Sequence, residues 1–181
     1  MKDLILITPQ RHLDERGYFS ELYHQKKIEE LGVNDIFVQD NHSLSFRAGT
    51  LRGLHFQAPP YAQAKLVRCG RGSIFDVAVD IRKGSPSFGQ WKGYNLTSEN
   101  GHQLYIPVGF AHGFLTLEEN SEIVYKCSNY YNSQSEGAVY WDDPDISIDW
   151  PLEGHPLLSE KDDRSPLLKD LFSPFEWENY S

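Results

Sequence analysis

The chain is 181 residues long, and its 17 Lys and Arg against 26 Asp and Glu give a formal net charge of −9 at pH 7. This balance excludes nonspecific binding to a nucleic-acid duplex, which requires a basic surface. With 39% hydrophobic residues and 10 Phe, 10 Tyr and 4 Trp, a disordered chain is also excluded, and we expect a single domain over residues 1–181.

The first apolar run, Leu4 to Ile7, is too short for the core of a signal peptide or for a membrane-spanning helix, which needs ~20 apolar residues. The two cysteines, Cys69 and Cys127, are too few for the disulfide framework of a secreted domain, and we expect both to be buried. These features predict a cytoplasmic protein with no membrane partner.

Short runs rich in Val, Ile, Tyr and Phe alternate with turn signals along the chain. This pattern predicts an all-β fold, either a sandwich or a barrel such as a jelly roll. Helices are predicted only from Lys26 to Leu31 and from Ser159 to about Leu171, and the tail after Pro151 is expected to pack outside the barrel. The predicted strands, in chain order, are 3–8, 17–23, 36–45, 50–57, 64–69, 73–81, 88–97, 103–107, 112–118, 121–131 and 137–142.

Potential cations lie in the neighbouring predicted strands 50–57 and 64–69, where Arg52, His55 and Lys65 occur among apolar residues. Because Arg and Lys are rarely buried without a partner, this pattern predicts a pocket for an anion, with a histidine that can move protons. A regular strand places Arg52 and His55 on opposite faces. Either Gly53 forms a bulge that turns both inward, or Arg52 faces solvent and His55 is a hydrogen-bonded core residue.

In the predicted strand 73–81, Asp76 shares a face with Ala78 and interrupts an otherwise apolar sequence. It is therefore either a surface residue or a residue of the barrel interior. His112 lies beside Gly113 at the start of the next candidate strand, where backbone can approach a ligand closely. His55 and His112 together suggest a metal site, but the carboxylate and further histidine that such a site needs are missing, so we predict none.

Tyr125 and Tyr131 share a face of the predicted strand 121–131 and are separated by about 20 Å along it. A ligand with one end at a reaction centre and one flat end could contact both. The alternative is that both are ordinary strand aromatics.

Many separate sequence blocks, in order from about residue 8 to residue 168, carry a family resemblance. They are residues 14–19, 37–43, 51–57, 63–68, 75–82, 85–91, 103–114, 125–126, 129–131, 135–137 and 158–162. On these blocks the chain resembles the dTDP-4-dehydrorhamnose 3,5-epimerases, cupin-fold enzymes of dTDP-L-rhamnose synthesis. The resemblance implies a cupin-type jelly-roll barrel with a few short peripheral helices. It also implies an isomerase that inverts C3 and C5 of dTDP-4-dehydro-6-deoxy-D-glucose.

The resemblance assigns a role to each matching residue. His55 matches the general base, Asp162 the carboxylate that orients it, and Tyr125 the general acid on the opposite face of the sugar. Lys65 matches the cation beside the C4 oxygen. The substrate-binding matches are Arg52 and His112 around the sugar and diphosphate, Arg16 and Glu21 at the nucleotide with Gln39, Asp40 and Asn41 in the same pocket, Tyr131 stacked on thymine, and Glu136 and Lys161 at further ligand contacts.

The resemblance further implies a homodimer with exchanged N-terminal strands, and neither a metal nor an organic cofactor. Two alternatives stay open. One is a relative that acts on another nucleotide 4-keto sugar or inverts a single centre, and the other is an inactive barrel that binds a nucleotide sugar. The presence of His55, Tyr125 and Lys65 together with Asp162 disfavours the inactive barrel.

Overall fold

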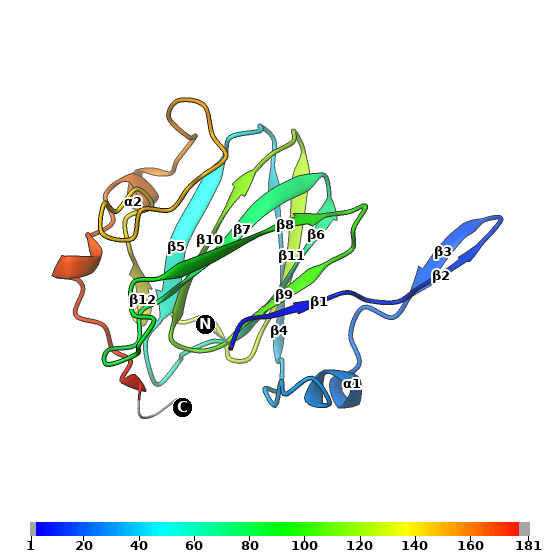
Figure 1. Ribbon diagram of the computed structural model, residues 1–181, viewed down its shortest axis with the longest axis horizontal. Coiled ribbons are helices and arrows are strands. Elements are labelled where there is room, and N and C mark those ends of the chain that lie inside the picture. The colour runs from blue at the N-terminus through cyan, green and yellow to red at the C-terminus, as the bar shows by residue number, and fades with distance from the viewer. Residues whose placement is uncertain (1–2, 178–181) are drawn as a thin grey trace.

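Two five-stranded antiparallel sheets face each other in the computed structural model, which describes residues 3–177 (Figure 1). The first sheet has the order β1 (Ile5–Ile7), β9 (Gln103–Ile106), β6 (Lys65–Arg71), β11 (Ser121–Cys127) and β4 (Gln39–Ser45). The second has the order β12 (Glu136–Ala138), β5 (Leu51–Gln57), β10 (Phe110–Thr116), β7 (Ser73–Asp80) and β8 (Trp91–Thr97). The predicted all-β, cupin-type barrel is confirmed.

The main core fills the space between the two sheets, where Val67 and Ile123 of the first sheet meet Ile74 and Ala78 of the second. A second apolar cluster covers the outer face of the second sheet, because Leu168 and the rest of the C-terminal segment pack against it. The expectation that the tail packs outside the barrel is therefore confirmed. Cys69 and Cys127 are free and buried, as predicted.

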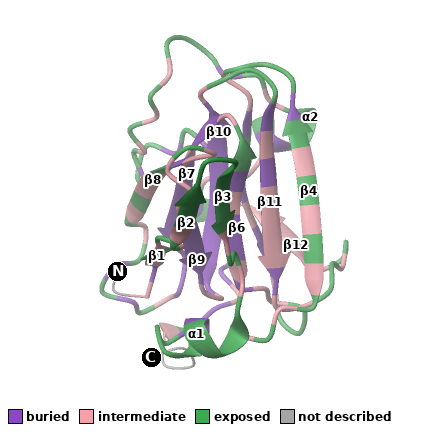
Figure 2. Ribbon diagram, turned by 90° about the vertical axis from the view of Figure 1, so that its right-hand side faces the viewer, coloured by how far each residue is buried: buried purple, intermediate pink, exposed green. Residues whose placement is uncertain are grey.

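A β-hairpin of β2 (Arg11–Asp14) and β3 (Gly17–Ser20) projects from the barrel as an arm (Figure 1). The arm and the adjacent helix α1 (Gln25–Glu29) are mostly exposed, in contrast to the buried central strands (Figure 2). The sequence predicted only one strand here, 17–23, and missed β2. Leu13 and Phe19 of the arm are large apolar residues that stay mostly exposed in this chain.

Two predicted elements end much earlier than expected. The predicted strand 121–131 stops at Cys127, because that residue pairs with Gln39 and Lys65, the first residues of both neighbouring strands. The predicted helix 159–171 is wrong. It is reduced to α2 (Glu160–Asp163) and a 3-10 turn at Leu168–Asp170, because Pro166 lacks the amide that a continuing helix needs. In the described part of the chain, no helix is long and apolar enough to cross a membrane.

Candidate active site

A cavity of about 370 Å³ lies between the two sheets. Residues from both sheets line it, and the edge strands β4 and β12 contribute to its wall. The lining is polar and rich in hydrogen-bonding groups. It consists of Gln39, Asn41, His55, Phe56, Gln57, Gln63, Lys65, Tyr125, Cys127, Tyr131 and Glu136.

His55, on β5, faces a buried carboxylate. Its Nε2 lies 2.6 Å from Oδ1 of Asp162, on α2. Ser159 caps that helix by accepting a hydrogen bond of 3.1 Å from the backbone amide of Asp162. Burial raises the pKa of Asp162, but the hydrogen bond with His55 and the charge of that imidazole lower it. The hydrogen bond with Ser159 lowers it further, so the pKa of Asp162 lies below its ordinary value. Asp162 is therefore ionised near neutral pH and orients the imidazole ring.

A bulge at Gly53 sets the direction of His55. Along β5 and β10, His55 pairs with His112 and Arg52 pairs with Phe114, so β5 holds one extra residue between the two pairs. Gly53 has a φ of 137°, and a Cβ there would lie 2.5 Å from Cα of Gly113, so this position excludes side chains. Neither of the two alternatives holds in full: the bulge is present and His55 lines the cavity, but Arg52 is exposed and lies outside the cavity lining.

Arg52 instead reaches across to the other sheet. Its guanidinium donates to Oγ of Ser45 and to the carbonyl of Leu44, both on β4 and both at 3.3 Å. These bonds tie β5 to β4, the edge strand of the facing sheet, at a point where no backbone ladder joins the two sheets. Arg52 is exposed, but its positive charge lowers the pKa of the Tyr125 phenol, against the larger effect of burial.

Tyr125 and Lys65 stand on the sheet opposite His55, on β11 and β6. Burial raises the pKa of Tyr125, so the phenol keeps its proton at neutral pH. Burial lowers the pKa of Lys65, and the negative charges of Asp76 and Glu136 oppose this lowering. Within residues 3–177, the Lys65 amine has no hydrogen bond and no ion pair, so all its donors are available to a ligand in the cavity.

A second histidine–carboxylate pair lies behind the cavity wall. Nε2 of His112 is 2.9 Å from Oδ2 of Asp76, and both residues are buried. Burial lowers the pKa of His112 despite the nearby Asp76. Of the two readings of Asp76, the barrel interior is correct, and its alternation with Ile74 and Ala78 was the signal. His55 and His112 each face their own carboxylate, and the described residues contain no cluster of three or more metal-ligating side chains.

Comparisons with known proteins agree with this geometry. The family model described as dTDP-4-dehydrorhamnose 3,5-epimerase matches residues 1–170. The chain belongs to this family. An epimerase of that name from Salmonella typhimurium is 56% identical over 167 residues, which cover 92% of this chain and 91% of the relative.

Solved structures of epimerases give the same result. A dTDP-6-deoxy-D-glucose-3,5-epimerase from Legionella pneumophila, crystallised with dTDP-4-keto-L-rhamnose, superimposes with a TM-score of 0.91 at 48% identity over 94% of this chain and 90% of that one. A 3'-monoepimerase from Streptomyces bikiniensis, in complex with dTDP-quinovose, gives a TM-score of 0.86 at 35% identity over 92% of this chain and 84% of that one.

At one end of the epimerase cavity, the structure brings together residues that lie far apart in the sequence. The Tyr131 hydroxyl donates to Oε2 of Glu136 at 3.3 Å, and Lys161 of α2 forms an ion pair with the same carboxylate. Tyr131 is not on a strand with Tyr125, because β11 ends at Cys127, so the proposed common strand face is wrong. Both tyrosines nevertheless line the cavity.

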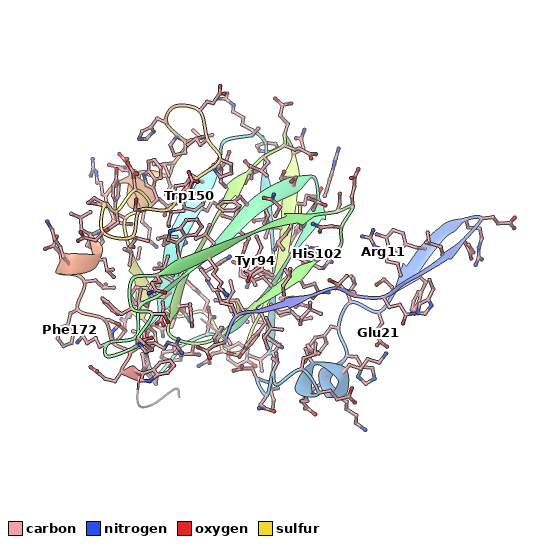
Figure 3. All side chains as sticks on the ribbon, in the orientation of Figure 1. Arg11, Glu21, Tyr94, His102, Trp150 and Phe172 are labelled. Carbon is pink, nitrogen blue, oxygen red and sulfur yellow. The ribbon has the colours of Figure 1, made fainter. Side chains whose placement is uncertain are left out.

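Three of the predicted nucleotide residues are not at this cavity in the same chain. Asp40 points away from it and binds Lys126 at 2.8 Å, because β4 alternates its faces and turns Gln39 and Asn41 inward. Arg16, whose side chain is 85% exposed, lies at the tip of the arm and pairs with Asp14. Glu21 lies at the base of the arm, outside the barrel, and pairs with Lys27 (Figure 3).

Proposed function

We propose that this epimerase converts dTDP-4-dehydro-6-deoxy-D-glucose to dTDP-4-dehydro-L-rhamnose by inverting C3 and C5 of the sugar. The observation that carries this assignment is the placement of His55, paired with Asp162, on one wall of the cavity and of Tyr125 on the facing sheet. A base and an acid on opposite sides of a bound sugar are what an inversion requires.

His55 removes the proton from the carbon next to the C4 ketone, and the electron pair moves into the carbonyl to give an enolate. The unpartnered ammonium of Lys65 stabilises the negative charge that develops on the C4 oxygen. Tyr125 then donates its proton to the same carbon from the other face, and the carbonyl re-forms. His55 and Tyr125 return to their initial states by proton exchange with solvent, and the cycle repeats at the second carbon.

The electrostatics of the cavity support this division of roles. The ionised Asp162 stabilises the imidazolium that forms when His55 accepts a proton. Burial raises the pKa of Tyr125, which keeps the phenol protonated until a strongly basic enolate carbon faces it. His112, held by Asp76, and Arg52, which spans β5 and β4, contribute at the periphery of the sugar and diphosphate.

The nucleotide occupies the end of the cavity lined by Tyr131. Tyr131 stacks on the thymine, while Gln39 and Asn41 contact the nucleotide from β4. Glu136 and Lys161 form the adjacent rim of the site. The crystal structure of a dTDP-4-dehydrorhamnose 3,5-epimerase from Bacillus anthracis, 48% identical to this chain, has TDP and PPi bound.

The working enzyme is a homodimer in which the N-terminal arms are exchanged. Arg16 lies in the turn of the arm and Glu21 at its base, both outside the cavity lining of their own chain, so they reach a nucleotide only in the site of a second copy. The free edge of β4 and the exposed apolar side chains of Leu13 and Phe19 are suitable surfaces for such an exchange. Residues 1–181 act as one epimerase domain in the cytoplasm, without a metal or an organic cofactor.

Incubation with dTDP-4-dehydro-6-deoxy-D-glucose in deuterated water tests the assignment. NMR should show deuterium at both C3 and C5 and the L-rhamno product. Deuterium at a single carbon would assign the chain to the single-centre epimerases, as in the Streptomyces bikiniensis 3'-monoepimerase. Binding of the nucleotide sugar without any exchange would contradict an enzymatic role.

A further inference from the structure

Side-chain amides hold the loop that carries Tyr131. Within the described chain, residues 129–131 make no backbone-to-backbone hydrogen bond. Three glutamines bind this loop instead. Gln63, which precedes β6, donates to the carbonyl of Asn129 at 2.7 Å, and Gln39 of β4 accepts from the amide of Tyr131 at 2.9 Å. Gln57 of β5 bonds on both sides of Tyr131. The Tyr131 side chain is 58% exposed, so packing in the core does not fix its position.

Gln57 makes the largest share of these contacts. It is the last residue of β5 and only 5% exposed. Its Oε1 accepts from the amide of Asn132 at 2.7 Å, and its Nε2 donates to the carbonyl of Tyr130 at 3.2 Å and to that of Tyr61 at 2.7 Å. The partners determine the orientation of the amide, because a flipped group would face an N–H with its nitrogen and two carbonyls with its oxygen.

We propose that Gln57 is a positioning residue for nucleotide recognition, and that it acts by fixing the 129–132 loop so that Tyr131 faces the base. The proposal rests on the proposed function, in which Tyr131 stacks on thymine. Because β5 also carries His55, Gln57 sets the loop relative to the catalytic base and so fixes the separation between the nucleotide end and the sugar end of the site.

Replacement of Gln57 by Met keeps the volume and removes all three hydrogen bonds. The loop then samples more conformations, and ordering Tyr131 costs free energy on each binding event. We expect dTDP to bind about tenfold more weakly by calorimetry, within the range set by complete loss of a stacked base. We expect KM for the nucleotide sugar to rise by a similar factor while kcat changes by less than about threefold, because the contact is remote from the reacting carbons.

A double-mutant cycle with Tyr131→Ala shows whether Gln57 acts through Tyr131. In the Tyr131→Ala background, Gln57→Met should weaken dTDP binding by less than about twofold, because the ring that it positions is gone. An undiminished effect in that background, or a fall in kcat with unchanged KM, would overturn the proposal. Thr116→Val is the control, since it removes a buried hydroxyl that holds another loop at residues 47–50, and dTDP affinity should stay at the wild-type value.

Gln63→Met tests the same idea if Gln57→Met does not fold, because it releases the loop at Asn129. It should raise the Kd of dTDP with the same dependence on Tyr131, and unchanged affinity would contradict the proposal. Failure of the proposed function is recognised separately, because it shows in the wild-type protein itself, as missing deuterium exchange at C3 or C5 or as missing dTDP binding.

Discussion

His55 depends for its orientation on Asp162, a carboxylate 107 positions later in the chain. In the proposed mechanism, this pair is half of an acid–base arrangement whose other half, Tyr125, stands on the facing sheet. The surroundings of the two groups differ in the way that these proposed roles require: His55 has an ionised partner, whereas burial keeps the phenol of Tyr125 neutral. Substitutions that leave the fold intact therefore separate proton removal from proton delivery.

Replacement of His55 by Asn should abolish solvent exchange at both C3 and C5, while dTDP binding is kept. The cavity lining contains no second histidine, and general-base catalysis contributes at least ~10²-fold. Deuterium incorporation followed by NMR is the measurement. His102→Asn, in the turn before β9, is the matched control and should exchange at the wild-type rate (Figure 3). Near wild-type turnover in His55→Asn would show that another group is the base.

Replacement of Tyr125 by Phe removes one hydroxyl and almost no volume. Proton removal by His55 should survive better than complete double inversion, so we expect partial exchange or a singly inverted product by NMR. Tyr94→Phe is the control, because Tyr94 packs against the same core cluster from β8. If Tyr125→Phe forms the doubly inverted product at the normal rate, Tyr125 is a packing residue only.

At the scale of elements, short segments position the side chains of the site. The four-residue helix α2 places Lys161 and Asp162 against neighbouring strands, β12 and β5, through Glu136 and His55. At the end of β7, Arg82 is buried between Asp80 and Asp3 and lies over the rings of Phe110 and Trp177. This ion-pair cluster joins the barrel to both terminal segments of the described chain.

Arg82→Met should destabilise the fold by about 3–5 kcal/mol at pH 7, because it leaves the buried carboxylate of Asp80 without its cation. Burial raises the pKa of Asp80, but hydrogen bonds from Arg82 and Ser85 outweigh it, so the native pKa lies below its ordinary value. The carboxylate therefore contributes stability above its unfolded pKa of about 3.9, and this contribution disappears as pH falls through the lower native value.

In Arg82→Met the stability contributed by the Asp80 carboxylate is already lost at neutral pH, because Asp80 protonates more easily without Arg82. The difference in unfolding free energy between wild type and Arg82→Met should narrow between pH 7 and pH 3 in urea titrations. Lys83→Met is the control, because it breaks a partly exposed pair with Glu176 and a contact with the exposed ring of Phe172, and it should cost about 0–1 kcal/mol. A difference in unfolding free energy that stays constant across this pH range would exclude Asp80 as the origin of the destabilisation.

At the scale of the whole molecule, the arm separates two groups of proposed site residues. His55, Tyr125 and Tyr131 line the cavity of the chain itself, whereas Arg16 and Glu21 lie on the arm outside the barrel. If two copies exchange arms, each active site is composite. Complementation tests for a composite site, because two inactivating substitutions can restore one intact site only when they lie on different subunits.

Hybrid dimers of an Arg16→Ala chain and a His55→Asn chain should recover about half of the wild-type turnover, since one of their two composite sites is intact. Co-expression with two different affinity tags yields the hybrid, and each homodimer serves as its own control. The Arg16→Ala homodimer should be weak in dTDP binding, and the His55→Asn homodimer inactive. Hybrids no more active than the mean of the two homodimers would mean that each site uses residues of one chain only.

The sequence by itself determined the fold class and the types of residue in the site, and it offered a bulge at Gly53 as one of two alternatives. Strand alternation is a local property, so it placed Asp76 on one face with Ala78, but it left open whether that face was the surface or the interior. The prediction that Asp40 and Asn41 share a pocket overlooked the same alternation, which sets them on opposite faces of β4. The bulge could be offered as an alternative because glycine tolerates backbone conformations that other residues rarely adopt, and the structure adds the close approach to Gly113 that requires glycine there. The roles of the individual site residues came from the family resemblance and remain predictions.

Only the tertiary structure decided where elements end and which distant residues meet. The alternating pattern continues past Cys127, but β11 stops there because both of its neighbours begin opposite that residue. The hydrogen bonds from Gln57 and Gln63 to the 129–132 loop could likewise not be predicted, because the carbonyls that accept them lie more than sixty positions away in the sequence. The physical reason is that periodicity fixes the face of a side chain locally, whereas the ends of strands and the partners of polar groups depend on nonlocal pairing.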